Sequence, residues 1–252
     1  MDFAETEEHR ALRAAVAEIA KKFGPRYYAE RAADRRPCTE LWTALGEAGF
    51  IGVNIPEAYG GGGAGLTELV LVCEEIAAAG TPLLLLVVSA AISAEMLTEF
   101  GTEEQRETWL PRLASGTSKM VFAITEPDAG SNTHRLSTTA KRDGADWVLN
   151  GTKYYISGVD EAEAVLVVAK TGQNALSLFL VPTDAAGLDK RLLPVDLLLP
   201  ERQFTLYFDN VRVGPGALVG EEGAGFRQVF HGLNPERITG AALAVEIGRA
   251  HV

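Results

Sequence analysis

The spacing of apolar residues changes twice along this chain, and this change constrains the fold more than any other feature. In the first part, Leu12, Val16 and Ile19 recur at helical spacing and form one apolar stripe. From about residue 118 the period falls to two, as segments 176–180 and 204–208 show, and a period of two is typical of strands. After residue 225 the helical period returns.

These changes predict an α+β multidomain fold with three parts. Residues 1–117 form an N-terminal α-helical domain, and residues 118–225 form a middle β-barrel-like domain. Residues 226–252 form one further helix.

Capping signals predict where several helices begin and end. The most apolar helix, 83–97, is expected to begin with Thr81 as its N-cap and Pro82 in its first position. A capping box at 102–105 predicts the start of the next helix, and Pro111 is expected to close or kink it.

Turn signals and a proline divide the second half of the chain. We expect turns between strands at 143–144 (Asp-Gly) and at 150–151 (Asn-Gly). Pro235 is expected to start the last helix, which puts Glu236 in its first turn, near the positive end of the helix dipole. This helix continues to Val252 with no partner in its own sequence, so we expect it to pack against another chain or domain.

The charge balance excludes some classes of partner. The net charge is −11, from 23 basic and 34 acidic side chains, and such a chain repels the phosphates of nucleic acids. The apolar stretch 83–97 contains polar residues and is shorter than the roughly 18 residues of a membrane span. The acidic N-terminal residues do not resemble a signal peptide. We therefore expect a cytoplasmic protein without a membrane span or nucleic-acid partner.

The sequence shows no metal-site pattern and no strong nucleotide loop. The glycines of 60–65 match a dinucleotide-binding pattern, but the second strand of that motif does not follow, which favours a turn between helices. No two cysteines or histidines have metal-ligand spacing, so we expect no metal: Cys38, Cys73, His9, His134, His231 and His251.

The segment 122–131 carries the most chemistry. A strand here runs into a turn containing Pro127 and Gly130, which exposes backbone N–H groups and the hydroxyls of Thr125 and Ser131 on one rim. Such donors suit the edge of a heterocycle and a pyrophosphate. On chemistry alone, an ordinary strand-end turn is the favoured interpretation.

Two motifs connect the chain to a known family. Segment 122–131 resembles the acyl-CoA dehydrogenase signature Thr-Glu-Pro-x-Ala-Gly-Ser-Asp, with Asn132 in the last place. Segment 149–158 resembles the second signature, Asn-Gly-x-Lys-x-Trp-Ile-Thr/Ser. Further matches, at 40–61 and 208–226, extend the resemblance over essentially the whole chain. The chain is identified as a member of this family, stopping early in its C-terminal helical domain. The resemblance implies that residues 226–252 are the start of a C-terminal helical bundle, of which we expect only the first helix in this chain.

The resemblance implies that FAD binds against the middle domain. Tyr155 occupies the position where the family usually has Trp against the flavin face, and Ser157 is expected to reach flavin N5. Gly130 and Ser131 are expected near the pyrophosphate. The full set of implied flavin contacts is Phe122, Ile124, Thr125, Gly130, Ser131, Tyr155 and Ser157.

The resemblance also implies the reaction. A carboxylate takes the α-proton of an acyl-CoA thioester while the β-hydride passes to flavin N5, which yields the trans-2-enoyl-CoA. In a minority of the family the base is a Glu directly before an Arg, which here predicts Glu236 with Arg237 in support. In most members the base lies further downstream, so both positions stay open. Ser131, Asn234 and Arg237 are expected to contact the substrate.

The family's usual partners follow from the same resemblance. An electron-transfer flavoprotein would receive the electrons, and the complete protein would form a homodimer or homotetramer. Two alternatives stay open: a flavin oxidase or monooxygenase on the same fold, and an inactive fragment or structural subunit.

Overall fold

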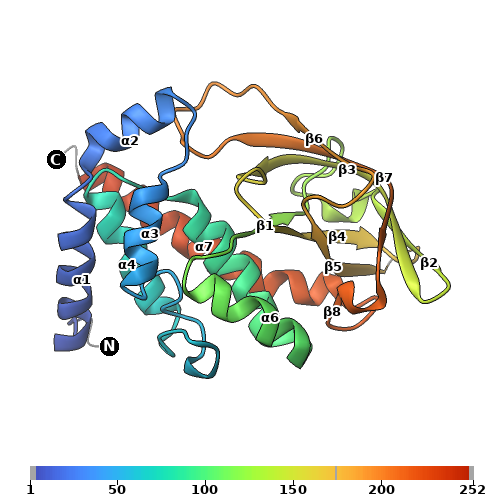
Figure 1. Cartoon of the computed structure of the whole chain (residues 1–252), viewed down its shortest axis with the longest axis horizontal. Coiled ribbons are helices and arrows are strands. Elements are labelled where there is room, and N and C mark those ends of the chain that lie inside the picture. Colours follow the sequence, from blue (N-terminus) through green and yellow to red (C-terminus); the bar gives the residue numbers. More distant parts are fainter. Residues whose placement is uncertain (1–3, 174, 250–252) are drawn as a thin grey trace.

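The fold is described from a computed structural model, which covers residues 4–173 and 175–249. Figure 1 shows helices gathered at one side of the molecule and strands at the other, with α7 running from the strands towards α1. The helices before the sheet are α1 (Glu7–Ala20), α2 (Gly24–Ala33), α3 (Thr39–Glu47), α4 (Leu66–Ala78), the π-helix η2 (Leu86–Ala94), α5 (Glu95–Phe100) and α6 (Glu103–Ala114).

The predicted helices are present, although some of their ends differ from the prediction. α6 begins at the predicted capping box, in which the Thr102 hydroxyl accepts from the Gln105 amide and the Gln105 side chain accepts in return. Pro111 does not close α6, since this helix continues to Ala114. α2 was not predicted; it starts at Gly24, whose positive φ of 70° redirects the chain after α1.

The helix predicted for 83–97 begins differently from its capping signals. Thr81 is not its N-cap, because its hydroxyl donates back to the carbonyl of Ile76, and the helix begins only at Leu84. The Leu84 amide instead donates to Oε1 of Glu201 at 2.9 Å. A buried carboxyl group from a distant loop therefore caps this helix, which then passes through η2 into α5.

The predicted strands form one eight-stranded sheet. Seven strands lie in the order β6-β7-β3-β2-β4-β5-β8, and β1 pairs in parallel with β4. The strands are β1 (Met120–Ala123), β2 (Thr139–Asp143), β3 (Asp146–Ser157), β4 (Ala164–Lys170), β5 (Leu176–Pro182), β6 (Leu188–Leu192), β7 (Gln203–Val213) and β8 (Leu218–Val219).

One of the two predicted turns is wrong. The turn after Asp143 connects β2 and β3 as expected, but Asn150 and Gly151 lie inside β3, where its pairing with β7 is irregular. A Cβ on Gly151 would lie 2.6 Å from the Cα of Thr138. Glycine at this position therefore permits the close approach of two backbones within the sheet.

The last helix, α7 (Gly225–Arg249), corrects two predictions. It begins at Gly225 rather than at Pro235, which lies inside it. It also has partners in its own chain, because it packs against α4 and η2, where Thr239 and Ala242 are buried. The predicted continuation to Val252 lies outside the described residues.

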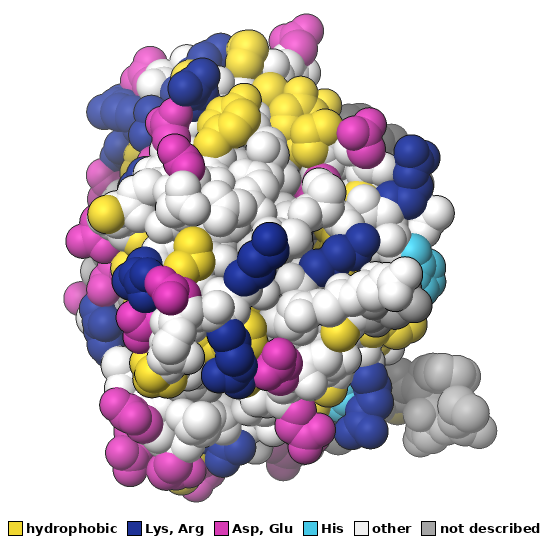
Figure 2. Space-filling model, turned by 90° about the vertical axis from the view of Figure 1, so that its right-hand side faces the viewer, with side chains coloured by type: hydrophobic (Ala, Val, Ile, Leu, Met, Phe, Trp, Pro, Cys, Tyr) yellow, Lys and Arg dark blue, Asp and Glu magenta, His cyan; other side chains and the backbone are white. Residues whose placement is uncertain are grey.

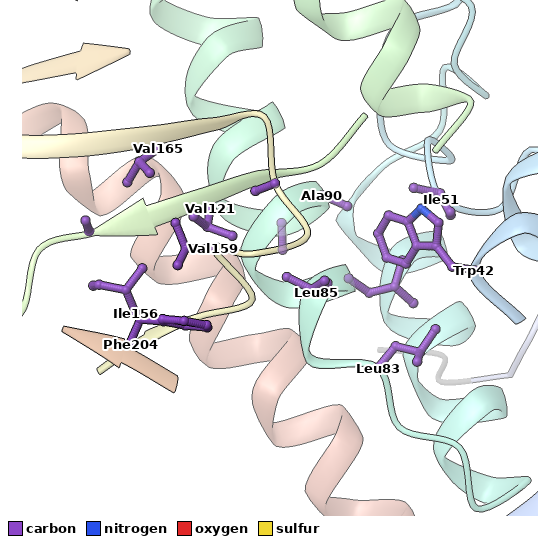
Figure 3. Packing of buried hydrophobic residues seen from close by; sticks show 14 of the residues in the cluster. Trp42, Ile51, Leu83, Leu85, Ala90, Val121, Ile156, Val159, Val165 and Phe204 are labelled. Atoms are coloured by element: carbon purple, nitrogen blue, oxygen red, sulfur yellow. The ribbon is translucent and has the colours of Figure 1, made fainter. Parts of the chain in front are cut away.

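Two hydrophobic clusters join the helices to the sheet. Figure 3 shows side chains of one cluster running from Trp42 on α3, through Leu85, to Val121, Ile156 and Phe204 on the strands. Leu85 also packs tightly on the backbone of Gly158, where an added Cβ would lie 2.8 Å from its side chain. The helix that follows Leu84 is therefore held directly against β3.

The outer face of the sheet side is mixed in charge. Figure 2 shows basic and acidic side chains interspersed over this face, with a group of hydrophobic side chains towards one end. Elsewhere in the structure, the partly exposed side chains of Arg142 and Glu222 form an ion pair at 2.9 Å. Within the part of the chain that is described, no helix combines the length and the apolar character that crossing a bilayer requires.

Candidate functional site

The two signature segments lie side by side just beyond the end of β1. β1 ends at Ala123, and the chain then passes alongside β3, where the Tyr154 amide donates to the Thr125 carbonyl at 2.8 Å. Both segments therefore present side chains to the same space, although some 30 residues separate them in the sequence.

A cavity of about 160 Å³ lies where these segments meet two helices. Its walls come from the Leu84 helix, from the end of β1, from β3 and from α7. Six of the residues predicted for the site line it together: Phe122, Ile124, Thr125, Tyr155, Ser157 and Glu236. The remaining lining residues are apolar: Leu84, Val87, Val88, Ile92, Ile156 and Leu233.

Tyr155 has an unusual backbone conformation. Its φ is 56°, in the left-handed region that side chains other than glycine rarely adopt, and its side chain is 55% exposed. The pairing of β3 with β7 is interrupted between Lys153 and Ile156, so Tyr155 lies outside the regular ladder. A strained residue at the mouth of a cavity is typical of a functional site.

Ser157 has a partner that sequence reasoning missed. Its hydroxyl donates to Oε1 of Gln203 at 2.9 Å, and Gln203 stands opposite Ser157 in the register of β3 and β7. No local sequence signal marks Gln203, because its role depends on a strand pairing across 46 residues.

A buried ion pair connects the two signature segments, and sequence reasoning missed this as well. Lys153 Nζ lies 2.9 Å from Oε1 of Glu126 and donates to the Ile124 carbonyl at 3.0 Å. The carboxylate also accepts from the Ser137 amide at 2.6 Å and hydroxyl at 2.7 Å, and from the Thr138 amide at 3.0 Å. The sequence offered one signal for this pair: Glu126 lies in the first signature segment and Lys153, of opposite charge, in the second.

The electrostatics of this pair keep it ionised at neutral pH. Burial alone raises the pKa of Glu126, but the Lys153 ammonium and the hydrogen bonds from Ser137 and Thr138 outweigh it and lower this pKa to about 2. Burial lowers the pKa of Lys153, and Glu126 opposes that effect. The pair thereby fixes Ile124 relative to β3.

Gly130 and Ser131 lie outside the cavity, on an exposed turn. The turn closes through reciprocal backbone hydrogen bonds between Glu126 and Ala129. Within the described part of the chain, the amides of Gly130 and Ser131 donate to no protein acceptor, and a Cβ on Gly130 would meet nothing within 4 Å. Both amides are therefore open to an anionic ligand on this rim.

Glu236 enters the cavity from the middle of α7, not from a helix start. It lies about three turns after Gly225, so the predicted effect of the helix dipole on its charge does not apply. Burial raises its pKa, and Arg237 partly opposes this shift. A half-buried carboxyl with a raised pKa in a cavity has the properties of a proton acceptor.

Asn234 and Arg237 do not enter this cavity. Both are exposed, and Arg237 donates to Oδ1 of Asn234 at 2.9 Å. Asn234 lines a separate open depression together with Glu95, His231 and Pro235. Any substrate contact made by Asn234 or Arg237 would therefore lie on the outer surface of α7 and not inside this cavity.

The cavity's chemistry fits the ring system of a flavin. The apolar side chains that line the cavity suit a flat aromatic ring, and the hydroxyls of Thr125 and Ser157 suit its polar edge. The free amides of the nearby turn suit a pyrophosphate. Over residues 4–173 and 175–249, no cluster of three or more His, Cys, Asp or Glu side chains could hold a metal ion.

Comparisons with family models match this chain in two adjoining stretches. The model described as acyl-CoA dehydrogenase, N-terminal domain, matches residues 6–117. The model described as acyl-CoA dehydrogenase, middle domain, matches residues 121–211.

Individual proteins give the same result. Acyl-CoA dehydrogenase FadE12 of Mycobacterium tuberculosis is 54% identical over 252 residues, and the match covers 98% of this chain and 65% of that protein. A glutaryl-coenzyme A dehydrogenase in complex with glutaryl-CoA has a TM-score of 0.95, with 31% identity over 99% of this chain and 66% of its own. A glutaryl-CoA dehydrogenase from Mycobacterium smegmatis, in complex with FADH2, has a TM-score of 0.88 and 30% identity, covering 96% of this chain and 62% of its own.

Proposed function

Because this chain belongs to the acyl-CoA dehydrogenase family, we propose that the whole protein is an FAD-dependent acyl-CoA dehydrogenase. The chain spans 65% of the length of FadE12, so the activity is proposed for the complete protein. The observation that carries the proposal is the cavity in which both signature segments meet the carboxyl of Glu236. The three predicted domains, 1–117, 118–225 and 226–252, are part of the same proposal.

Two groups of residues would hold FAD, one at its ring system and one at its pyrophosphate. Phe122, Ile124 and Tyr155 would contact the ring faces, and Thr125 and Ser157 its polar edge, with Ser157 at N5. The open amides of Gly130 and Ser131 would bind the pyrophosphate. The cavity of about 160 Å³ is smaller than the roughly 300–1,000 Å³ typical of ligand sites, so further contacts would come from outside the described residues.

The proposed chemistry is the removal of two hydrogens from the α and β carbons of an acyl-CoA. A bound flavin supplies the acceptor for the β-hydride. Glu236 would take the α-proton, for which its raised pKa and half-buried position are suited. Ser131, Asn234 and Arg237, all exposed near the cavity rim or on α7, would contact the polar part of the thioester ligand.

Partners follow from this chemistry. The two electrons must leave the flavin after each turnover, and we propose an electron-transfer flavoprotein as their acceptor. We also propose a homodimer or homotetramer, because Ile238 and Val245 leave an apolar stripe exposed along α7.

Replacement of the proposed base tests this function. Glu236→Gln in the full-length protein keeps the shape of the side chain but removes its capacity to take a proton. Turnover of acyl-CoA should fall by about 10²–10⁴-fold, the usual effect of losing a general base, while the flavin spectrum is retained. Steady-state kinetics with a dye acceptor would measure this change.

Glu221→Gln is the matched control, because Glu221 is exposed and lies outside the cavity. Its turnover should equal that of the parent. Near-normal turnover of Glu236→Gln would place the base elsewhere, and rapid oxidation of the reduced protein by oxygen would instead favour the oxidase or monooxygenase alternative.

A further inference from the structure

Gln203 is a buried polar residue whose side chain serves the cavity only through another residue. It is 6% exposed, at the start of β7, and stands opposite Ser157 in the register with β3. Its backbone carbonyl accepts from the Leu193 amide, so the strand around it is fixed on both sides. The side-chain carbonyl accepts the Ser157 hydroxyl at 2.9 Å.

This contact decides what Ser157 offers to the cavity. A serine hydroxyl has one proton to donate and two lone pairs that accept. Because the proton points to Oε1 of Gln203, only the lone pairs of Ser157 remain for a ligand in the cavity. Ser157 therefore acts towards the cavity as an acceptor.

A flavin changes its hydrogen-bonding character at N5 when it is reduced. The oxidised ring presents a lone pair at N5, whereas the two-electron-reduced ring presents an N–H group. We infer that Gln203 is a positioning residue that holds Ser157 as an acceptor and so favours the reduced flavin over the oxidised one. This inference rests on the proposed function, since it requires a flavin ring against Ser157.

Substitution of Gln203 should therefore lower the reduction potential of the bound flavin. Gln203→Met keeps the volume but removes the acceptor, which frees the Ser157 proton to donate to oxidised N5. Loss of one hydrogen bond that favours the reduced flavin corresponds to about a threefold to tenfold change in the equilibrium constant for flavin reduction. For a two-electron couple, this is a fall of about 15–30 mV. Dye-coupled redox titration of the full-length flavoprotein measures it.

The Ser157→Ala background separates this role from a purely structural one. In that background Gln203→Met should leave the potential unchanged, because no hydroxyl remains to be oriented. Ser157→Thr, which keeps the hydroxyl, should restore the response to Gln203→Met. Gln203→Leu gives the same comparison if the Met variant folds poorly, as monitored by thermal unfolding.

The outcomes distinguish the inference from the proposed function. An unmoved potential in Gln203→Met and Gln203→Leu, with flavin bound, overturns the inference alone. An equal shift with and without Ser157 overturns it too, because Gln203 would then act independently of the hydroxyl. Full-length parent protein that binds no flavin overturns the proposed function along with it.

Discussion

Lys153 and Glu126 show how single residues hold the candidate site together. Both side chains are almost completely buried, and each comes from a different signature segment. Their ion pair satisfies the Ile124 carbonyl and the amides of Ser137 and Thr138 at the same time. The charges in these motifs therefore have a structural role, because their ion pair holds in place the two segments that line the cavity.

Removing one member of this pair should destabilise the protein strongly. Lys153→Met leaves the Glu126 carboxylate buried without its counter-charge, which typically costs about 3–5 kcal/mol. The double variant Lys153→Met/Glu126→Leu should recover part of this loss, because no buried charge is then left unpaired. Urea unfolding of the three proteins would measure the difference.

The exposed pair Arg26–Glu30 on α2 is the matched control. Arg26→Met should change stability little, since solvent screens such pairs. If Lys153→Met were as mild as this control, the buried pair would not be what holds the two segments together.

At the scale of elements, the start of the Leu84 helix depends on one distant carboxyl. Glu201 is 5% exposed and accepts the Leu84 amide at Oε1, while its Oε2 has no hydrogen-bond partner within the described residues. Burial raises the pKa of Glu201 to about 7, and the nearby carboxyl of Glu161 adds to this shift.

This raised pKa makes stability depend on pH in a defined direction. Between pH 4.5 and about 7 the folded protein holds a proton at Glu201 that the unfolded chain has released, so this group's contribution to stability decreases as pH rises through that window. Glu201→Gln should remove the dependence while keeping an acceptor for the Leu84 amide. Urea unfolding at pH 5 and pH 8 should show that the free energy of unfolding falls more between these pH values for the parent than for the variant. Equal decreases in the two proteins would contradict the assignment.

The first residue of α7 is pressed against β5. A Cβ on Gly225 would lie 2.6 Å from the Leu176 carbonyl carbon and 2.8 Å from the Ser177 nitrogen. Because these are backbone atoms, Gly225→Ala should displace the start of α7 and lower the melting temperature. Gly240→Ala in the same helix meets nothing within 4 Å and should instead stabilise the protein, by about 1 kcal/mol. A higher melting temperature for Gly225→Ala would contradict this prediction, because α7 would then accommodate the added methyl group without loss of stability.

At the scale of the whole molecule, α7 packs with one face and exposes the other. Thr239 and Ala242 are buried against the chain, while Ile238 and Val245 are 48% and 55% exposed. These two exposed residues are seven positions apart, so they lie on the same side of the helix. A stripe of this kind suits contact with another subunit or another part of the protein.

The double variant Ile238→Asp/Val245→Asp should weaken self-association of the full-length protein. Charged side chains would be costly to bury in such an interface, so sedimentation velocity should show a smaller species. Leu192→Asp on β6, at a similar 46% exposure, is the control and should keep the parent's assembly state. A parent that sediments as a single monomer would contradict the proposed oligomer.

Much of the architecture follows from local patterns in the sequence. The two changes of apolar period predicted helices, then strands, then a helix, because an amphipathic face must repeat with the geometry of its own element. The capping box of α6 was equally readable, since all its atoms lie within one turn. The motif residues Thr125, Tyr155 and Glu236 were selected from the sequence, and the structure places all three around one cavity.

Only the tertiary structure decided the features that depend on distant partners. Glu201 caps Leu84 across 117 positions, and Gln203 orients Ser157 across 46, so no local pattern marks either contact. The start of α7 was misplaced for a related reason: Pro235 is a strong local signal for a helix start, but packing against α4 and η2 stabilises the helix around it. Sequence alone determined most of the elements, although not α2, and it selected the candidate motifs, because both depend on local patterns. Their meeting in one cavity is set by the two hydrophobic clusters, whose contacts exist only once the chain has folded.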